Sequence, residues 1–286
     1  MVLHWLHSVC ADEARLMKHQ PRKRFAQNFL HDQQVIDRII ASIAPQPTDL
    51  LIEIGPGRAA LTKPLVASGA ELHVLEIDRD LVAQLEKKFA HNSNITVHQC
   101  DALQADFSGI AGNRPFRLIG NLPYNISTPL IFHLLRWHEL VIDMHFMLQK
   151  EVVDRMASGP GSKAYGRLSV MTQFLCDVTP LFDVQPESFT PAPRVCSSIV
   201  RLQPLRTPPF ESGSDKSLQQ VVAAAFCQRR KTLRNSLRNL LRAEQIVAAG
   251  IDPGQRAEQL SLSQFAALAR ALPYDTRPAP SKRRSK

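Results

Sequence analysis

A buried strand that turns through glycines into a helix constrains the fold of this chain more than any other feature of its sequence. The strand is the apolar run Leu50–Ile54, the turn is 55–57 (Gly-Pro-Gly), and the helix is expected over 58–67. Glycine lets the backbone approach a ligand closely, and the first N–H groups of a helix are free to bind one. The turn alone is a weak indication, because Ala59 stands where a dinucleotide-binding fingerprint carries its third glycine.

Polar residues also end the next predicted strands. Glu76 comes about twenty residues after Gly55, the separation at which a doubly wound fold places a carboxylate on the ribose of a nucleotide-like cofactor. Asp101 and Asn121 end two further strands, and Asp101 could accept a hydrogen bond from an adenine amino group. The carboxyl ends of parallel strands share the edge of the sheet where α/β proteins bind ligands. The sequence therefore predicts a Rossmann-like, doubly wound α/β sheet with a nucleoside site at that edge.

The segment 121–124 carries the groups needed to hold an amino group by its hydrogens. The side-chain oxygen of Asn121 and the backbone carbonyl of Leu122 can both accept from an exocyclic NH2, while Pro123 fixes the turn without an N–H of its own. Tyr124 offers a flat face to a planar base. Asn and Pro are also common in ordinary turns, so the segment by itself leaves both interpretations open.

A single adenosine that carries a sulfonium, as in S-adenosylmethionine, suits this edge better than a dinucleotide. A dinucleotide needs room and donors for a pyrophosphate, whereas the turn with Pro56 and Ala59 and the two acids Glu76 and Asp101 suit one adenosine. A sulfonium methyl is also the electrophile that an amine held at Asn121 requires.

These segments resemble the ribosomal RNA adenine N6,N6-dimethyltransferase family, and within it the bacterial enzymes of the small ribosomal subunit. The matching segments, between Lys18 and Leu272, are 24–30 (RFAQNFL), 53–57 (EIGPG), 76–78 (EID), 101–103 (DAL), 121–127 (NLPYNIS) and 189–195 (FTPAPRV). The family usually has glycine where Ala26 stands, which affects only one loop. The resemblance implies an S-adenosylmethionine-dependent methyltransferase sheet of Rossmann-like type, followed by a small C-terminal all-helical domain.

By this resemblance, the chain would transfer methyl groups from S-adenosylmethionine to N6 of two adjacent adenosines in the 3′-terminal hairpin loop of 16S small-subunit rRNA. This role belongs to small-subunit biogenesis, and the implied partner is small-subunit rRNA within a partly assembled 30S particle. The family's cofactor contacts fall on Asn28, Leu30, Gly55, Glu76, Asp101 and Asn121. Its target-base pocket falls on Asn121, Leu122, Tyr124 and Phe189.

In this pocket, Tyr124 and Phe189 would sandwich the extruded base, while Asn121 and Leu122 orient its amine. The alternative interpretation of Phe189 is a core aromatic, and the surrounding Pro186, Pro191 and Pro193 argue against it because they disfavour a strand or helix. No dedicated general base is expected, because the methylated, positively charged nitrogen is acidic and can lose its proton to water.

A net charge of +9 suits an RNA partner, and its distribution along the chain is more informative than its size. Basic residues cluster at 22–24, 229–242 and 282–286. In the middle cluster arginines recur every four residues, which predicts a stripe on one helix with leucines opposite. Such a stripe is often only a solvated face, but the lack of an acid before Glu244 favours phosphate binding. The predicted RNA-binding residues are Arg22, Lys23, Arg24, Arg230, Arg234 and Arg238.

The sequence divides into four parts. Residues 1–17 are expected to be an N-terminal extension, or to reflect a start codon placed too early, since 17–19 resembles a usual start in the family. Residues 18–205 are expected to form the methyltransferase domain. Residues 206–274 are expected to form a helical RNA-binding domain with helices near 216–228, 231–243 and 261–271. Residues 275–286 are expected to be a basic disordered tail, since they lack apolar residues.

Cysteine and histidine placement predicts a reduced cytoplasmic protein without a metal site. The five cysteines are odd in number and far apart, and the ten histidines are scattered. No stretch has the length and hydrophobicity of a membrane span, and a monomer is expected.

Two alternatives to a small-subunit dimethyltransferase remain. One is a large-subunit rRNA adenine N6-methyltransferase of the antibiotic-resistance type, which the segments 189–195 and 229–235 disfavour, and the other is an RNA-binding assembly factor whose methylation is incidental.

Overall fold

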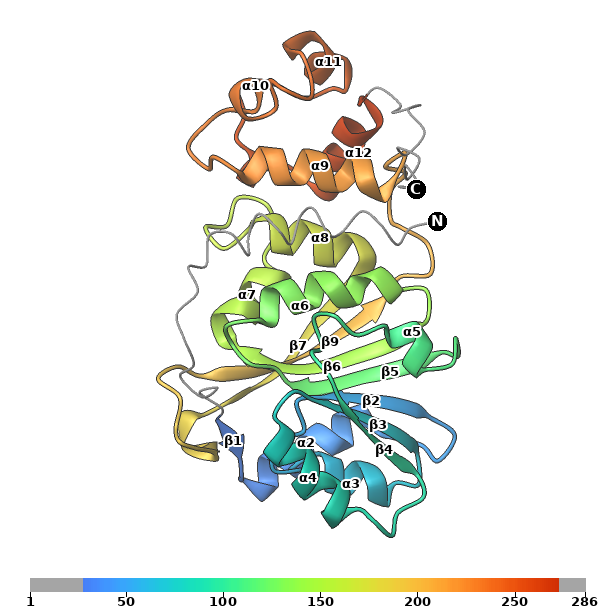
Figure 1. The fold of residues 1–286 in the computed structure, drawn as a ribbon. Helices are drawn as coiled ribbons and strands as arrows, with labels where there is room; N and C mark the ends of the chain where they lie inside the picture. Colours follow the sequence, from blue (N-terminus) through green and yellow to red (C-terminus); the bar gives the residue numbers. More distant parts are fainter. Residues whose placement is uncertain (1–27, 273–286) are drawn as a thin grey trace, which may run out of the picture. The chain divides into compact units, whose positions relative to one another are not determined.

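The computed structural model describes residues 28–272, which form two compact units (Figure 1). The first contains residues up to Ser158 together with Thr172–Thr207, and the second contains Gly159–Met171 together with the residues from Pro208 onward. The sequence placed the division after residue 205 and assigned 159–171 to the first domain, whereas this segment clusters with the helical residues. The predicted extension 1–17, the basic cluster 22–24 and the predicted tail 275–286 lie outside the described residues.

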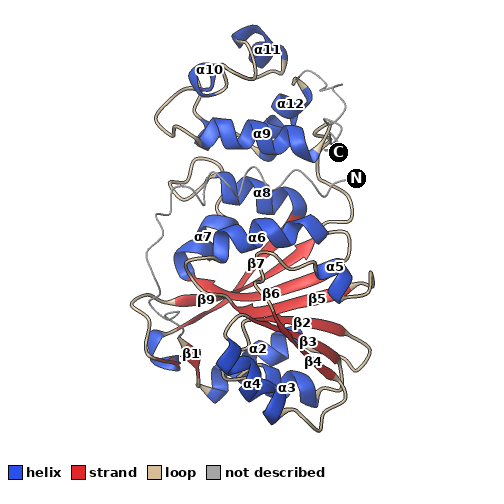
Figure 2. Cartoon of the chain, viewed as in Figure 1, coloured by secondary structure: helices blue, strands red, loops and turns tan. Residues whose placement is uncertain are grey.

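The first unit is built on a seven-stranded sheet (Figure 2). In spatial order the strands are β4 (Ile95–Gln99), β3 (Glu71–Glu76), β2 (Leu50–Ile54), β5 (Phe116–Asn121), β6 (Val141–Gln149), β9 (Ser197–Pro204) and β7 (Cys176–Val184). The first five pair in parallel, and β9 pairs antiparallel with both β6 and β7. The strand order reverses between β2 and β5, where open α/β sheets leave a crevice for ligands. The predicted doubly wound α/β sheet is confirmed.

Helices cover both faces of this sheet (Figure 1). One face carries α2 (Gln33–Ile43), α3 (Thr62–Ala67) and α4 (Arg79–Lys88), and the other carries α6 (Ser127–Leu134) and α7 (Lys150–Ala157). Shorter elements of this unit are α5 (Phe107–Ile110), η1 (Leu135–Trp137), η2 (Pro186–Ser188), and the strands β1 (Phe29–Leu30) and β8 (Phe189–Thr190), which pair with each other. Helix α2 begins where the Asp32 carboxylate accepts the N–H groups of Gln34 and Val35, an N-cap that satisfies otherwise free donors.

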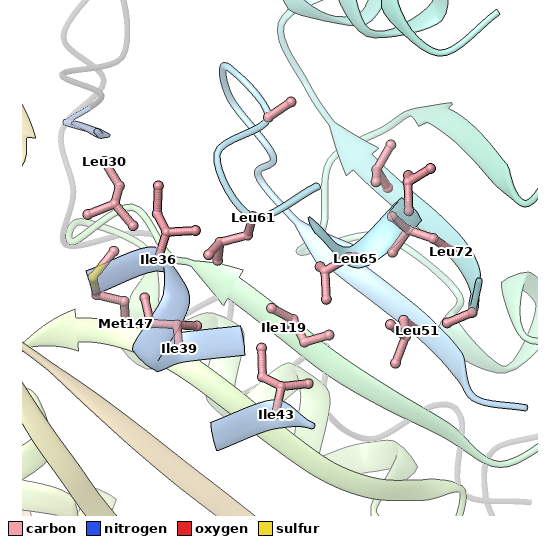
Figure 3. Close-up of a cluster of buried hydrophobic side chains, with 14 of the residues drawn as sticks. Leu30, Ile36, Ile39, Ile43, Leu51, Leu61, Leu65, Leu72, Ile119 and Met147 are labelled. Atoms are coloured by element: carbon pink, nitrogen blue, oxygen red, sulfur yellow. The ribbon is translucent and has the colours of Figure 1, made fainter. Parts of the chain in front are cut away.

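A hydrophobic core holds α2 and α3 against the sheet (Figure 3). Ile36, Ile39 and Ile43 recur along α2 at helical spacing and are 5 % exposed or less. They pack in one cluster with Leu51 of β2 and Ile119 of β5. Burying each such side chain contributes about 1.5–3 kcal/mol, so this core fixes the two strands whose carboxyl ends flank the crevice.

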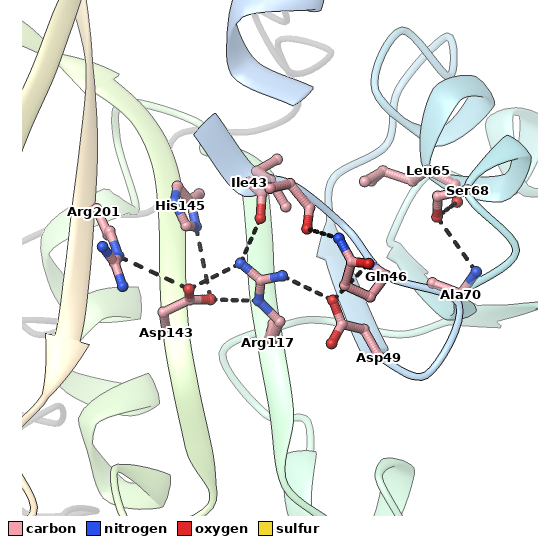
Figure 4. A network of polar contacts seen from close by, with 11 residues as sticks. Ile43, Gln46, Asp49, Leu65, Ser68, Ala70, Arg117, Asp143, His145 and Arg201 are labelled. Atoms are coloured by element: carbon pink, nitrogen blue, oxygen red, sulfur yellow. Dashed lines mark hydrogen bonds and ion pairs between the residues drawn. The ribbon is translucent and has the colours of Figure 1, made fainter. Parts of the chain in front are cut away.

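A buried ion-pair network ties together the amino ends of the parallel strands (Figure 4). The Arg117 guanidinium donates to both Asp143 oxygens, at 2.8 and 2.9 Å, and to Asp49 Oδ2 at 2.8 Å. It also donates to the backbone carbonyl of Ile43 at 2.7 Å. Asp49 precedes β2, Arg117 lies in β5 and Asp143 in β6, so one side chain links three strands and α2 at the edge opposite the crevice.

The second unit is helical. Its helices are α9 (Asp215–Phe226), α10 (Leu233–Ser236), α11 (Ala243–Ala248), η3 (Ala257–Gln259) and α12 (Leu262–Arg270). The segment 159–171, which holds the start of α8 (Arg167–Leu175), joins this unit through Tyr165, whose hydroxyl donates to the carbonyl of Leu260 at 3.0 Å. Across residues 28–272, no helix has the length and apolar character needed to cross a membrane.

The predicted continuous helix over 231–243 is wrong. Helix α10 has four residues, and the backbone N–H groups of Leu233 and Arg234 bond to the carbonyls of Gln255 and Pro253. Leu233, Leu237 and Leu241, at a spacing of four residues, are nevertheless buried. The hydrogen bonds to residues 253–255 could not be inferred from that spacing, because they join segments about twenty residues apart.

Candidate active site

A cleft of about 510 Å³ lies at the carboxyl edge of the sheet, in the first unit. Its lining comes from three segments: residues 28–30 at β1, the end of β2 with the turn and loop that follow, and residues 121–125 from the end of β5 onward. The cleft therefore opens where the strand order reverses. It brings together six residues that the sequence singled out, namely Asn28, Leu30, Gly55, Asn121, Leu122 and Tyr124.

The glycine turn after β2 is shaped by backbone conformations that favour glycine. Gly55 and Gly57 have φ angles of +68° and +55°, in the left-handed region. Ala59 also has a positive φ of +67°, and α3 starts only at Thr62. The predicted helix start at residue 58 was therefore four residues early, because the chain makes a further turn before it becomes helical.

The close approach of β2 and β5 explains why residue 120 is a glycine. A Cβ atom added to Gly120 would lie 2.7 Å from the carbonyl oxygen of Ile54 and 2.9 Å from Leu122 Cδ2. Only glycine lets the strands meet at this distance, and Asn121 follows directly. The absence of a side chain at residue 120 therefore sets the distance between the glycine turn and the amide of Asn121.

Glu76 is buried at the end of β3 and binds backbone N–H groups. Its Oε1 accepts from Ile77 and Asp78 at 3.0 Å each, and its Oε2 accepts from Gly57 at 3.3 Å. Burial raises the pKa of Glu76, while these three hydrogen bonds oppose the rise. The carboxylate thus ties the glycine turn to β3.

Asp101 and an exposed Ile77 extend the same edge toward β4. Asp101 accepts from the backbone N–H of Leu103 at 2.9 Å. It follows Cys100, whose N–H donates to the Glu76 carbonyl at 3.0 Å, so Asp101 and Glu76 stand on neighbouring strands. Ile77 is 45 % exposed, which offers an apolar surface next to the two acids. Asp101 and Glu76 lie outside the lining of the 510 Å³ cleft, on the adjoining edge.

The amide of Asn121 is oriented by Asn28. Its Nδ2 donates to the backbone carbonyl of Asn28 at 3.2 Å, which makes the side-chain oxygen the acceptor available to a ligand. The next residue is also fixed, because the N–H of Leu122 donates to the Met147 carbonyl at 3.1 Å. The Asn121 side chain is therefore held by the residue that precedes β1, and the backbone at Leu122 is held by β6.

The two aromatic residues predicted to stack on a base have different positions. Tyr124 lines the cleft, is partly exposed, and shares a hydrogen bond of 2.7 Å with the hydroxyl of Ser197. Phe189 is only 3 % exposed, belongs to the hydrophobic core and pairs with Leu30 between β8 and β1. The prolines around Phe189 therefore do not prevent a two-residue strand, and its burial agrees with the alternative interpretation as a core aromatic, while stacking of its ring on a base stays a prediction.

Glu53 is a cleft residue that the sequence analysis did not single out as functional. It lies in β2, is 2 % exposed and lines the cleft, and no hydrogen-bond partner of its Oε2 is found among the described residues. Burial raises its pKa to about 7; the Thr62 hydroxyl opposes this and the charge of Glu76 adds to it. The available signal was a single acid inside the otherwise apolar run Leu50–Ile54.

The predicted RNA-contacting arginines that are described lie in the second unit. Arg230, Arg234 and Arg238 are all exposed, in a turn, in α10 and after α10, respectively. They therefore do not form the predicted stripe along one helix, although each remains open to an anion. Arg22, Lys23 and Arg24 lie outside the described residues. Residues 28–272 contain no cluster of three or more His, Cys, Asp or Glu groups that could hold a metal ion.

Comparisons with known proteins show the family to which the chain belongs. The family model described as ribosomal RNA adenine dimethylase matches residues 18–273. Ribosomal RNA small subunit methyltransferase A of Methylococcus capsulatus is 54 % identical over 256 residues, covering 90 % of this chain and 99 % of the relative. The protein of the same name from Saccharophagus degradans is 54 % identical, covering 89 % and 95 %.

Two solved structures share the fold of this chain. The 23S rRNA methyltransferase ErmE is 27 % identical, with a TM-score of 0.67, covering 86 % of this chain and 99 % of that one. A dimethyladenosine transferase from Plasmodium falciparum, 24 % identical, shares the fold with a TM-score of 0.72, covering 84 % and 95 %. With the cleft geometry and the family match over most of its length, the chain belongs to the ribosomal RNA adenine dimethylase family.

Proposed function

We propose that this protein transfers methyl groups from S-adenosylmethionine to N6 of two adjacent adenosines in the 3′-terminal hairpin loop of 16S rRNA. The observation that carries the proposal is the cleft, which places the glycine turn, the buried Glu53 and the acceptors of Asn121 and Leu122 on one concave surface. The high identity to proteins named for the small subunit favours that subunit over the large one.

The residues of the cleft suit a cofactor that is an adenosine with a positive charge. Glu53 offers a buried oxygen without a partner among the described residues, which a cationic group would satisfy. Gly57 gives room, because a Cβ there would lie 3.2 Å from the Phe29 ring. Asn28, Leu30, Gly55, Glu76, Asp101 and Asn121 would hold the cofactor, with Ile77 beside the adenine. When bound, S-adenosylmethionine supplies an electrophilic methyl group.

Asn121 and Leu122 would hold the target amine. The lone pair of an adenine N6 is delocalised into the ring, so the amine is a poor nucleophile until it is polarised. Acceptors on both of its hydrogens, from the Asn121 side chain and the Leu122 carbonyl, favour a tetrahedral nitrogen whose lone pair points away from them. Holding the nitrogen in line with its electrophile supplies most of the acceleration, because the reaction becomes effectively unimolecular.

Tyr124 would provide the face on which the extruded base stacks. Stacking of a base on an aromatic side chain contributes about 1–3 kcal/mol, enough to offset part of the cost of unstacking the adenosine. The ring belongs to a fixed turn, because the N–H of Ile126 donates to the Pro123 carbonyl and Ser127 Oγ donates to the Tyr124 carbonyl, both at 3.1 Å.

The exposed arginines of the second unit would contact RNA phosphates. Arg230, Arg234 and Arg238, together with Arg22, Lys23 and Arg24, would contribute to binding that is independent of base sequence. The partner would be small-subunit rRNA in a partly assembled 30S particle, and the protein would act in the cytoplasm as a monomer.

Methylation of isolated ribosomal particles tests this function. The purified protein is incubated with labelled S-adenosylmethionine and either small or large subunits from cells that lack the modification, and the rRNA nucleosides are analysed by mass spectrometry. The expected product is N6,N6-dimethyladenosine in small-subunit rRNA only. The Asn121→Ala variant should lose activity, whereas Asn92→Ala, at an exposed loop, should not. Product confined to large-subunit rRNA, or no transfer to either subunit, would refute the proposal.

A further inference from the structure

One hydrogen bond ties the ring of Tyr124 to the sheet. The Tyr124 hydroxyl and Ser197 Oγ are 2.7 Å apart, and Ser197 is 0 % exposed. Ser197 is the first residue of β9, and it is opposite Gln149 of β6 and Val184 of β7 in the antiparallel pairings. Its backbone is therefore fixed from both sides, which makes its hydroxyl a rigid anchor.

Tyr124 itself lies outside the sheet. It belongs to the turn between β5 and α6, where Ser127 Oγ donates to its backbone carbonyl. Among the described residues, Ser197 is the side-chain partner of its phenolic oxygen. The angle that the Tyr124 ring presents to the cleft is thus set by a bond to a strand far along the chain. Without that bond, the ring could rotate while the turn remained in place.

The two methyl transfers to one nitrogen place different demands on this site. Before the first transfer, the amine has two N–H donors, which the acceptors of Asn121 and Leu122 can both hold. In each transfer the nitrogen lone pair forms the new C–N bond, the S–C bond breaks with its electron pair going to sulfur, and one proton leaves the nitrogen to water. Before the second transfer only one N–H remains, so one acceptor has no donor.

The alignment of the monomethylated nitrogen must then come from the plane of the base. We propose that Ser197 is a positioning residue that holds the Tyr124 ring for the second methyl transfer, and that this transfer depends on Ser197 more than the first does. The inference rests on the proposed function. It adds a residue remote from the reacting atoms, and it assigns that residue to one of the two steps.

The Ser197→Ala variant separates the two steps. Monomethyladenosine and dimethyladenosine in small-subunit rRNA are quantified by mass spectrometry at matched total methylation. Losing one neutral hydrogen bond should slow the second transfer by about three- to tenfold and the first by less, so monomethyladenosine accumulates. Tyr124→Phe removes the same bond from the other side and should give the same product ratio. The double variant should be no worse than either single one.

The neighbouring serine provides a matched control. Ser198 is also buried, at 2 % exposure, but its Oγ bonds to the Phe182 carbonyl at 3.3 Å instead of to Tyr124. Ser198→Ala should therefore leave the ratio of the two products unchanged. The ratio at matched total methylation is insensitive to the amount of folded enzyme, so a general loss of stability does not imitate the expected result. If Ser197→Ala does not fold, Tyr124→Phe alone carries the test.

An unchanged product ratio in both Ser197→Ala and Tyr124→Phe would overturn the inference, as would effects that add in the double variant. Failure of the proposed function has a different signature. In that case the wild-type protein itself would leave no dimethyladenosine in small-subunit rRNA, whatever residue stood at 197.

Discussion

The carboxyl groups of Glu53 and Glu76 lie at the ends of adjacent parallel strands, both 2 % exposed, and only one has its oxygens satisfied by hydrogen bonds. Glu76 accepts three backbone N–H groups, so its charge is stabilised within the fold. Glu53 has an oxygen without a partner among the described residues, and its pKa is raised to about 7. Glu53 is therefore the acid whose proton a bound cation would displace.

Cofactor binding should release a proton from Glu53. Below pH 7 most Glu53 side chains are protonated, and a cationic ligand favours the anion, so binding at pH 6 should release about one proton and the affinity should rise toward pH 8. Calorimetry in two buffers of different ionisation enthalpy counts this proton.

The Glu53→Gln variant should release no proton at pH 6. Glu71→Gln is the matched control, because Arg114 lowers the pKa of Glu71 to about 2 and this acid is already ionised. Equal proton release from the wild type and from Glu53→Gln would show that another group titrates.

The stability of the protein should depend on pH through the same residue. The folded pKa of Glu53, about 7, exceeds the ordinary value of 4.5, so the folded state binds more protons between these two values. The contribution of Glu53 to the free energy of unfolding is on the order of 3 kcal/mol. It is fully present below pH 4.5, falls as the pH rises, and is lost above pH 7. Urea unfolding from pH 4.5 to 8 gives the difference in free energy of unfolding between the wild type and Glu53→Gln. This difference should fall with pH in the same way. A difference independent of pH would contradict it.

Removing Asp143 should strongly destabilise the first unit. Arg117 is 9 % exposed and would be left buried without its main partner, which costs about 3–5 kcal/mol. Glu71→Ala breaks the exposed pair with Arg114 and should cost less than about 1 kcal/mol. Urea unfolding of Asp143→Ala and Glu71→Ala compares the two directly. Similar losses would mean that the network in Figure 4 is no stronger than a surface pair.

Replacing Arg234 and Arg238 should weaken RNA binding. Each lost phosphate contact should reduce the slope of log affinity against log salt by roughly one unit. Filter binding of small-subunit rRNA between low and moderate salt gives this slope for the double alanine variant. Lys63→Ala with Lys87→Ala, which removes two exposed cations of α3 and α4, is the control. An unchanged slope in the arginine variant would make these side chains ordinary solvated surface.

The local sequence was sufficient to predict the order of polar residues at the sheet edge. Each of Gly55, Glu76, Asp101 and Asn121 ends a strand or follows one within two residues. Hydrophobic periodicity and turn residues identify such strand ends without knowledge of distant contacts. The strand order β4-β3-β2-β5 then places all four side by side. Doubly wound topology follows general rules of chain connection, which is why this part of the prediction succeeded.

Interactions between distant segments explain what the sequence did not predict. Phe189 is buried because β8 pairs with β1, and the first N–H groups of α10, from Leu233 and Arg234, bond to residues 253–255. Glu53 escaped notice because its importance lies in an unpartnered oxygen, which only the packing around it determines. None of these contacts can be read from the local hydrophobic pattern of the sequence.

The pairing of β1 with β8 determines when, during translation, the cleft can form. One wall of the cleft, at Asn28 and Leu30, is held in place by Phe189 and by the His31 N–H bond of 3.0 Å to the Ser188 carbonyl. A ribosome making this chain must therefore translate some 160 residues beyond Leu30 before that wall has its support. A nascent chain released before Ser188 would carry the glycine turn and Asn121 but lack the brace for Asn28. The complete cleft thus forms late in synthesis, after most of the sheet has been made.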